Sequence, residues 1–175
     1  GEKKCKQLCE RFGYPKNNPQ TGNLNPMYAK SPSKKSGIGI KSHLYHDGNF
    51  IFCRSFLELK IYLYLIDNNI KFQMSKHRIK YKYNDIDRTY CPDIILEDNT
   101  VCEIKPSNLT KLEINKEKYK SMERYCSDFN LKCRYITELD FDIKKYNDLN
   151  HILNLINNKI ILMDEKNLEK LKRNI

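Results

Sequence analysis

Residues 91–105 read CPDIILEDNTVCEIK and predict a β-hairpin. A run of apolar and β-branched residues over 90–96 is followed by a polar turn and a second such run, as in an antiparallel strand pair. Side chains alternate between the two faces of a strand, so Glu103 and Lys105 are expected on one face. Asp93 is expected roughly across from them once the turn closes. The hairpin therefore predicts two carboxylates and one ammonium in one place.

This combination of side chains favours a divalent cation. Two carboxylates a few ångströms apart raise each other's pKa unless a cation lies between them. A hard cation that prefers oxygen ligands, Mg²⁺ with Mn²⁺ as a substitute, removes that cost. Lys105 then has the chemistry to orient an attacking water or to stabilise a charged phosphate. These residue types point to metal-dependent phosphodiester chemistry.

The pair Pro92-Asp93, followed by Glu103-Ile104-Lys105, resembles the signature of the PD-(D/E)XK nuclease superfamily. That superfamily also supplies an acid from a preceding helix, and Glu58 matches this position. The resemblance implies that Glu58, Asp93 and Glu103 hold the divalent metal and that Lys105 assists the water. The predicted order of elements also agrees with the superfamily: a helix, strands, the acid pair, then a further helix and strand.

Each of these residues also has a purely structural interpretation. Residues 55–58 form an S-x-x-E capping box, in which Glu58 only binds the helix N-terminus. Against this, the helix predicted over residues 56–66 is apolar nearly all round, so a carboxylate at its start needs a partner. Asp93 would otherwise be a strand-edge residue. Glu103 and Lys105 would otherwise be an exposed pair on a solvated strand face.

The segment before the helix extends the resemblance. Residues 41–53 predict a hairpin with Asp47-Gly48 at its turn. Residues 50–105 are similar to the nuclease domains of phage homing endonucleases in the same superfamily. Arg54 is a candidate contact to the scissile phosphate; the alternative is a surface arginine at a helix start.

Residues 71–83 alternate basic residues with apolar or aromatic ones, which predicts a strand with one basic face. Lys76, Arg78 and Lys80 share that face, and we expect them to lie on the DNA backbone. The alternative is a solvated strand face.

The chain after Lys105 predicts mostly helices. A helix over residues 112–126 carries a basic stripe, in which Lys116 and Lys120 are secondary candidates for DNA binding. A strand over 131–137 would complete a small mixed sheet. Two amphipathic helices, over 149–162 and 165–171, carry no recognisable chemistry.

Residues 1–40 predict a basic arm, since four prolines among polar residues prevent long helices or strands. Residues 22–30, GNLNPMYAK, resemble the opening of a nuclease-associated modular DNA-binding motif of homing endonucleases. Ala29 departs from the glycine usual in that motif. The alternative is an Asn-Pro turn in a basic linker. The DNA-binding candidates in the arm are Asn25, Lys30, Lys34 and Lys35.

Composition limits the class of protein. The formal net charge of +10, much of it before residue 50, favours a polyanionic partner. Seven cysteines without regular disulfide spacing, and the lack of a signal-peptide pattern or long apolar run, predict a reducing cytosol. Cys5 and Cys9 form a C-x₃-C pair that is either half of a zinc site or an unpaired half motif.

The sequence therefore predicts an α/β fold with a small mixed β-sheet flanked by helices, a restriction-endonuclease-like core. Three parts are expected: a DNA-binding arm at 1–40, a nuclease core at 41–140 and a helical extension at 141–175. The predicted activity is Mg²⁺-dependent cleavage of double-stranded DNA by a phage or mobile-element homing endonuclease in the host cytoplasm, with no membrane partner and with homodimerisation open. The alternatives are a structure-specific or transposon-end nuclease of the same fold, and a non-catalytic DNA-binding protein.

Overall fold

The computed structural model describes residues 39–175. The predictions for Asn25, Lys30, Lys34, Lys35, Cys5 and Cys9 lie outside the described residues, as does the motif at 22–30. Residues 39–175 form one compact unit. Its strands are β1 (Ser42–His46), β2 (Asn49–Cys53), β3 (Phe72–Met74), β4 (Ile79–Tyr83), β5 (Ile86–Tyr90), β6 (Ile94–Leu96), β7 (Thr100–Ile104), β8 (Lys132–Ile136) and β9 (Ile161–Leu162). Its helices are α2 (Phe56–Asp67), α3 (Ser107–Thr110), α4 (Glu113–Asp128), the 3-10 helix η2 (Lys144–Asn147), α5 (Leu149–Asn157) and α6 (Glu165–Asn174).

The central sheet has the strand order β3-β6-β7-β8. β3, β6 and β7 pair antiparallel, whereas β7 and β8 pair parallel. The parallel pair requires a crossover, which α3 and α4 provide. The predicted mixed sheet with flanking helices is confirmed at this level.

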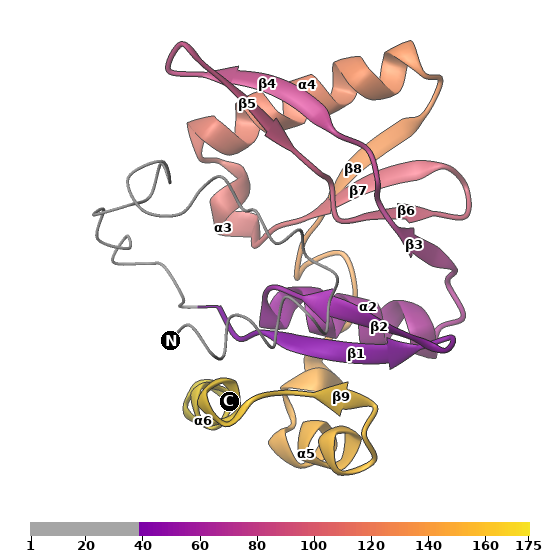
Figure 1. Ribbon diagram of the computed structural model, residues 1–175, viewed down its shortest axis with the longest axis vertical. Coiled ribbons are helices and arrows are strands. Elements are labelled where there is room, and N and C mark those ends of the chain that lie inside the picture. The colour runs from indigo at the N-terminus through magenta and orange to yellow at the C-terminus, as the bar shows by residue number, and fades with distance from the viewer. Residues whose placement is uncertain (1–38) are drawn as a thin grey trace, which may run out of the picture. The chain divides into compact units, whose positions relative to one another are not determined.

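Helix α2 lies between two sheets, which explains its apolar character on nearly all sides (Figure 1). Its buried side chains belong to one core with Leu44 of β1 on one side and with Ile94 and Ile104 of the central sheet on the other. Ser55 caps its N-terminus by accepting a hydrogen bond from the Glu58 N–H. At its C-terminus Asn69 adopts the left-handed conformation (φ 54°), and the Ile70 N–H bonds back to the Leu65 carbonyl.

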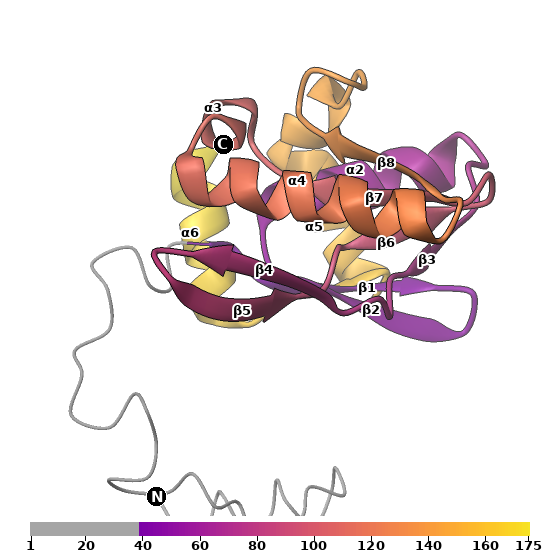
Figure 2. The same ribbon diagram turned by 90° about the horizontal axis from the view of Figure 1, so that it is seen from above.

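Helix α4 covers the opposite face of the central sheet. Met122 and Cys126 of α4 pack with Val101 of β7 and Ile79 of β4. The β4–β5 hairpin runs alongside α4 in both views (Figures 1 and 2). Since both faces of the sheet are covered, all five residues of β7 are buried.

Two predicted strands were wrong in extent. The strand over 90–96 is divided, because Tyr90 ends β5 and β6 begins only at Ile94; Pro92, in between, has no N–H to give to a ladder. The strand over 71–83 is likewise divided into β3 and β4, which belong to different sheets. A tight turn at Asn84-Asp85, both left-handed (φ 51° and 58°), folds β5 back onto β4, so β4 pairs with β5 and not with the central sheet.

The hairpin predicted over residues 41–53 is confirmed as β1 and β2, with left-handed Asp47-Gly48 at the turn. The helix predicted over 149–162 was wrong in its last part, because Ile161–Leu162 form β9 and pair with β1. Ile161 is fully buried in the core that also contains Leu44, so packing overrides the helical pattern there. Within residues 39–175, no helix combines the length and the apolar character that a membrane span requires.

Candidate active site

Glu103 and Lys105 lie on the α4 side of β7, whereas Cys102 and Ile104 face the α2 core. Lys105 Nζ lies 2.8 Å from Glu103 Oε1, and the two side chains are 24% and 6% exposed. The interpretation as an exposed pair on a solvated face was therefore wrong. The predicted placement of both residues on one face is confirmed.

Asp93 lies directly before β6 and is bound to β7 at two points. Its Oδ2 accepts a hydrogen bond from the Ile104 N–H (2.7 Å), and its own N–H donates to the Cys102 carbonyl (3.0 Å). Burial raises the pKa of Asp93 to about 7, and the nearby carboxylates of Glu103 and Glu58 add to this, while the Ile104 N–H and Lys105 oppose it. Asp93 is therefore a carboxylate whose negative charge is not fully balanced.

Glu58 is buried at the start of α2, with 8% of its surface exposed. Its Oε1 accepts from the Ser55 hydroxyl (3.0 Å), and its Oε2 accepts from the Arg54 N–H (2.8 Å). This geometry confirms the capping box, with Arg54 in place of Ser55 as the backbone donor. The same carboxylate contributes to raising the pKa of Asp93. Glu58 thus caps the helix and also lies near the other two acids.

Lys105 is held in its charged form. Burial lowers the pKa of its ammonium, but the carboxylates of Glu103, Asp93 and Glu58 outweigh that effect, and the net pKa is raised. A firmly protonated lysine is a hydrogen-bond donor and a positive charge, not a general base. Its chemistry is to stabilise a developing negative charge.

Lys118 of α4 is a further member of the site that the sequence analysis missed. Its Nζ lies 5.4 Å from the ring centroid of Tyr90 and 5.7 Å from that of Tyr81. Burial lowers the pKa of Lys118, and the charge of Lys105 lowers it further, whereas Glu103 and Asp93 raise it. The signal in the sequence is its spacing, four residues before Met122 and thus on the buried side of the helix.

Two tyrosines near Glu103 bond to the backbone of α4. Tyr90 donates from its hydroxyl to the Lys118 carbonyl (2.9 Å), and Tyr135 donates to the Asn115 carbonyl (2.6 Å). Tyr135 is the register partner of Glu103 across β7 and β8. The charge of Glu103 raises the pKa of both phenols, after burial, so both hydroxyls remain protonated donors.

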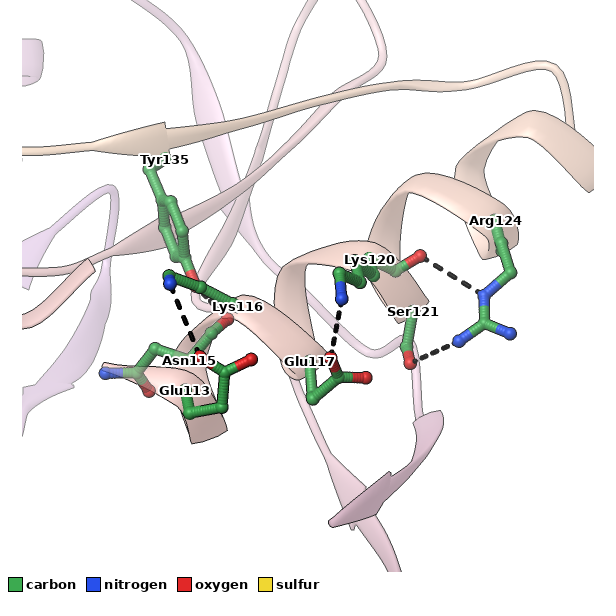
Figure 3. Close-up of polar contacts among 8 residues, drawn as sticks. All are labelled: Glu113, Asn115, Lys116, Glu117, Lys120, Ser121, Arg124 and Tyr135. Carbon is green, nitrogen blue, oxygen red and sulfur yellow. Dashed lines mark hydrogen bonds and ion pairs between the residues drawn. The ribbon is translucent and has the colours of Figure 1, made fainter. Parts of the chain in front are cut away.

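The basic stripe predicted on α4 is paired with acids of the same helix. Lys116 Nζ lies 3.3 Å from Glu113 Oε2, and Lys120 Nζ lies 2.7 Å from Glu117 Oε1 (Figure 3). Such i,i+3 pairs contribute little stability, but they cancel much of the positive charge that a polyanion would meet. Neither lysine makes an ion pair or hydrogen bond with Asp93 or Glu103 among the residues described.

The other basic residues predicted to bind DNA within residues 39–175 have exposed side chains. Arg54 is exposed just before α2 and uses its backbone N–H to bind Glu58. Lys76 and Arg78 lie in the segment between β3 and β4, and Lys80 lies on the exposed face of β4. Within residues 39–175, no ion pair or side-chain hydrogen bond joins these four side chains to Glu58, Asp93 or Glu103.

Within residues 39–175, no three His, Cys, Asp or Glu side chains converge as a ready metal-binding group. Both oxygens of Glu58 already accept hydrogen bonds at the helix start. Asp93 and Glu103 nevertheless suit Mg²⁺, since both offer oxygen ligands and a cation would offset the effects of burial and of the neighbouring carboxylates, which raise the pKa of Asp93. Burial, and after it the charges of Asp93 and Glu58, raise the pKa of the Tyr62 hydroxyl, which has no hydrogen-bond partner in the described part of the chain.

In comparisons with known proteins, no protein-family model and no curated protein matches the chain.

Proposed function

We propose that the protein is a metal-dependent endonuclease of the PD-(D/E)XK class that hydrolyses phosphodiester bonds in DNA. The observation that carries this proposal is the placement of Asp93, Glu103 and Lys105 at the neighbouring ends of β6 and β7, with a charge on Asp93 that the Ile104 N–H and Lys105 balance only in part. The element order supports it: α2, the antiparallel strands β3, β6 and β7, then α4 and the parallel strand β8. In this scheme the β4–β5 hairpin is an insertion into a restriction-endonuclease-like core.

In this proposal the acidic residues bind the metal and the lysines stabilise negative charge. Asp93 and Glu103 would hold Mg²⁺, for which Mn²⁺ would substitute, and Glu58 would add negative charge beside them. A bound divalent ion lowers the pKa of a coordinated water and offsets charge on the phosphate. Lys105 and Lys118 supply the positive charge that stabilises the transition state, since each is held near the acids.

The substrate in this proposal is double-stranded DNA, for which the net charge of +10 provides attraction. By resemblance, the protein is a site-specific homing endonuclease of a phage or mobile element, active in the host cytoplasm. Cleavage of both strands would require a homodimer or sequential cuts.

A second candidate, a non-catalytic DNA-binding protein, is favoured by one observation. Glu103 is bound by Lys105, and Glu58 is fully used by the helix cap. In such a protein these contacts would serve stability alone.

The two candidates are separated by incubating the protein with linear, supercoiled and branched DNA in Mg²⁺, in Mn²⁺ and in EDTA. Glu103→Ala and Lys105→Ala are compared with Lys116→Ala, a surface control. Metal-dependent cuts that both site variants lose and the control retains would establish the nuclease. DNA binding without cuts in any protein would leave the binding function. Preference for the branched substrate would favour a structure-specific enzyme.

A further inference from the structure

A cavity of about 800 Å³ lies between the β4–β5 hairpin and α4, and none of the acid-cluster residues lines it. Its wall contains five basic side chains: Arg78, Lys80, Lys82, Arg88 and Arg124. Two acids, Asp87 and Asp128, also lie in the wall. The lining thus has a clear excess of positive charge.

Most of these cations lack a counter-charge. Among the ion pairs formed within residues 39–175, only Lys82 of the five takes part, with Asp85 at 3.5 Å. Arg78, Lys80, Arg88 and Arg124 form none, although Asp87 and Asp128 are in the same wall. This contrasts with Lys116 and Lys120, which are paired on the same helix (Figure 3). Four like charges around one cavity repel one another, and a bound polyanion would remove that repulsion.

Two guanidiniums are positioned from opposite walls. Arg124 donates from Nε to the Lys120 carbonyl (3.4 Å) and from an Nη to the Ser121 hydroxyl (3.3 Å), which leaves further N–H donors for a ligand (Figure 3). Arg88 is on β5 opposite Tyr81, and its guanidinium lies 5.9 Å from the ring centroid of Tyr83. A planar guanidinium held in place matches the oxygens of a phosphate.

The cavity is also connected to the acid cluster by charge. After burial, the charge of Lys105 beside the acids and the weaker influence of Arg88 from the cavity wall both lower the pKa of Lys118. Helix α4 carries both Lys118 and Arg124 of the cavity wall, so the cavity and the acid cluster share this helix. A chain of phosphates is a ligand that can contact both places at once.

We propose that this cavity binds the phosphate backbone of a DNA strand, with Arg88 and Arg124 as its principal contacts. The site deepens the proposed function, and rests on it, in that the bound strand continues to the acid cluster. The inserted β4–β5 hairpin would therefore bind DNA, although it carries none of the proposed catalytic residues. Lys116 and Lys120, on the paired face of α4, have no part in it.

The test measures binding of a short fluorescent DNA duplex in EDTA, where no cleavage occurs, by anisotropy at several salt concentrations. The Arg88→Gln/Arg124→Gln double variant is compared with Lys116→Gln/Lys120→Gln, which removes the same formal charge. We expect the first variant to bind at least about tenfold more weakly and to lose about two units of the salt-dependence slope. The control should change neither quantity appreciably.

Arg88→Lys/Arg124→Lys, which keeps the charge, should recover much of the affinity, and thermal unfolding of all variants excludes a folding defect as the cause. Equal affinities for the two glutamine variants would overturn the proposal. Loss of tripolyphosphate binding with unchanged DNA binding would also overturn it, in favour of a small-anion site. If the wild-type protein does not cut DNA in Mg²⁺ but the two glutamine variants still differ in DNA affinity, the proposed nuclease function is refuted and the binding site is not.

Discussion

Lys105 Nζ lies 2.8 Å from Glu103 Oε1, and most of the surface of both side chains is buried. Glu103 therefore has its counter-charge within the protein, whereas Asp93 relies on backbone N–H groups and on neighbouring residues. The pair and the unbalanced acid have different consequences for stability.

Lys105→Met should destabilise the protein by about 3 kcal/mol, because it leaves the buried Glu103 carboxylate without its cation. Glu103→Gln/Lys105→Met should recover a large part of that loss, since the double variant buries no charge at this point. Urea unfolding of Lys105→Met, Glu103→Gln and the double variant measures the coupling free energy between the two side chains. Simple additivity of the two effects would show that the pair contributes nothing.

Asp93→Asn should stabilise the metal-free protein by roughly 1–3 kcal/mol at about pH 8. Folding raises the pKa of Asp93 from 3.8 to about 7, so the folded protein binds a proton at Asp93 more tightly than the unfolded chain does. The free energy of unfolding of the wild type therefore falls as the pH rises between these values, and the variant lacks that contribution. Near pH 4 the two proteins should be equally stable.

Mg²⁺ should raise the melting temperature of the wild type at pH 8 and not that of Asp93→Asn. Asp98→Asn is a control for the pH dependence described for Asp93, with the opposite sign. Hydrogen bonds from Thr100 and Lys132 lower the pKa of Asp98, so the Asp98 carboxylate stabilises the folded wild type at neutral pH and this contribution is lost in acid. An equal Mg²⁺ response in wild type and Asp93→Asn would exclude Asp93 as a ligand.

Ser55→Ala and Glu58→Gln should separate the two roles of the α2 N-terminus. Ser55→Ala removes the acceptor for the Glu58 N–H and should cost about 1 kcal/mol with little effect on cleavage at saturating metal. Glu58→Gln retains an acceptor for the Arg54 N–H but removes the charge, so cleavage should fall at least about tenfold. Similar cleavage rates for both variants would reduce Glu58 to a capping residue.

Lys118→Met should lower metal-dependent cleavage by about ten- to a hundredfold without loss of stability. The pKa of Lys118 is lowered in the fold, so its charge is unfavourable there, and methionine retains an apolar chain beside Tyr81 and Tyr90. Lys116→Met, two residues earlier on the paired face of α4, is the matched control. Cleavage rates and unfolding curves for both variants check the prediction, and equal rates would contradict it.

The sequence predicted the local features of this fold best. The Asp47-Gly48 hairpin, the capped helix at Ser55 and the placement of Glu103 with Lys105 all follow from turn residues and strand periodicity, and the structure confirms them. Each of these patterns is contained within a few consecutive residues.

Features that depend on distant contacts were not predictable in the same way. Ile161 and Leu162 continue a helical pattern, but pairing with β1 makes them a strand. Lys118 was overlooked because its neighbours Lys116 and Lys120 show a more regular spacing, while its position beside Tyr90 depends on a strand from elsewhere in the chain. The pairing of Lys116 and Lys120 with Glu113 and Glu117, in contrast, was visible as an i,i+3 pattern in the helix itself.

The pairing of β9 with β1 joins two segments that lie far apart in the sequence and are therefore synthesised at different times. Leu44 and Ile161 are register partners, and the Lys41 N–H donates to Asn167 Oδ1 at 3.0 Å. During synthesis this edge of β1 stays open, and an open strand edge is prone to pair with other chains. Helix α2 shares its core with Ile161, so part of the packing around α2 comes from a segment that is synthesised after the whole central sheet. The core around α2 therefore stays incomplete until β9 has paired with β1.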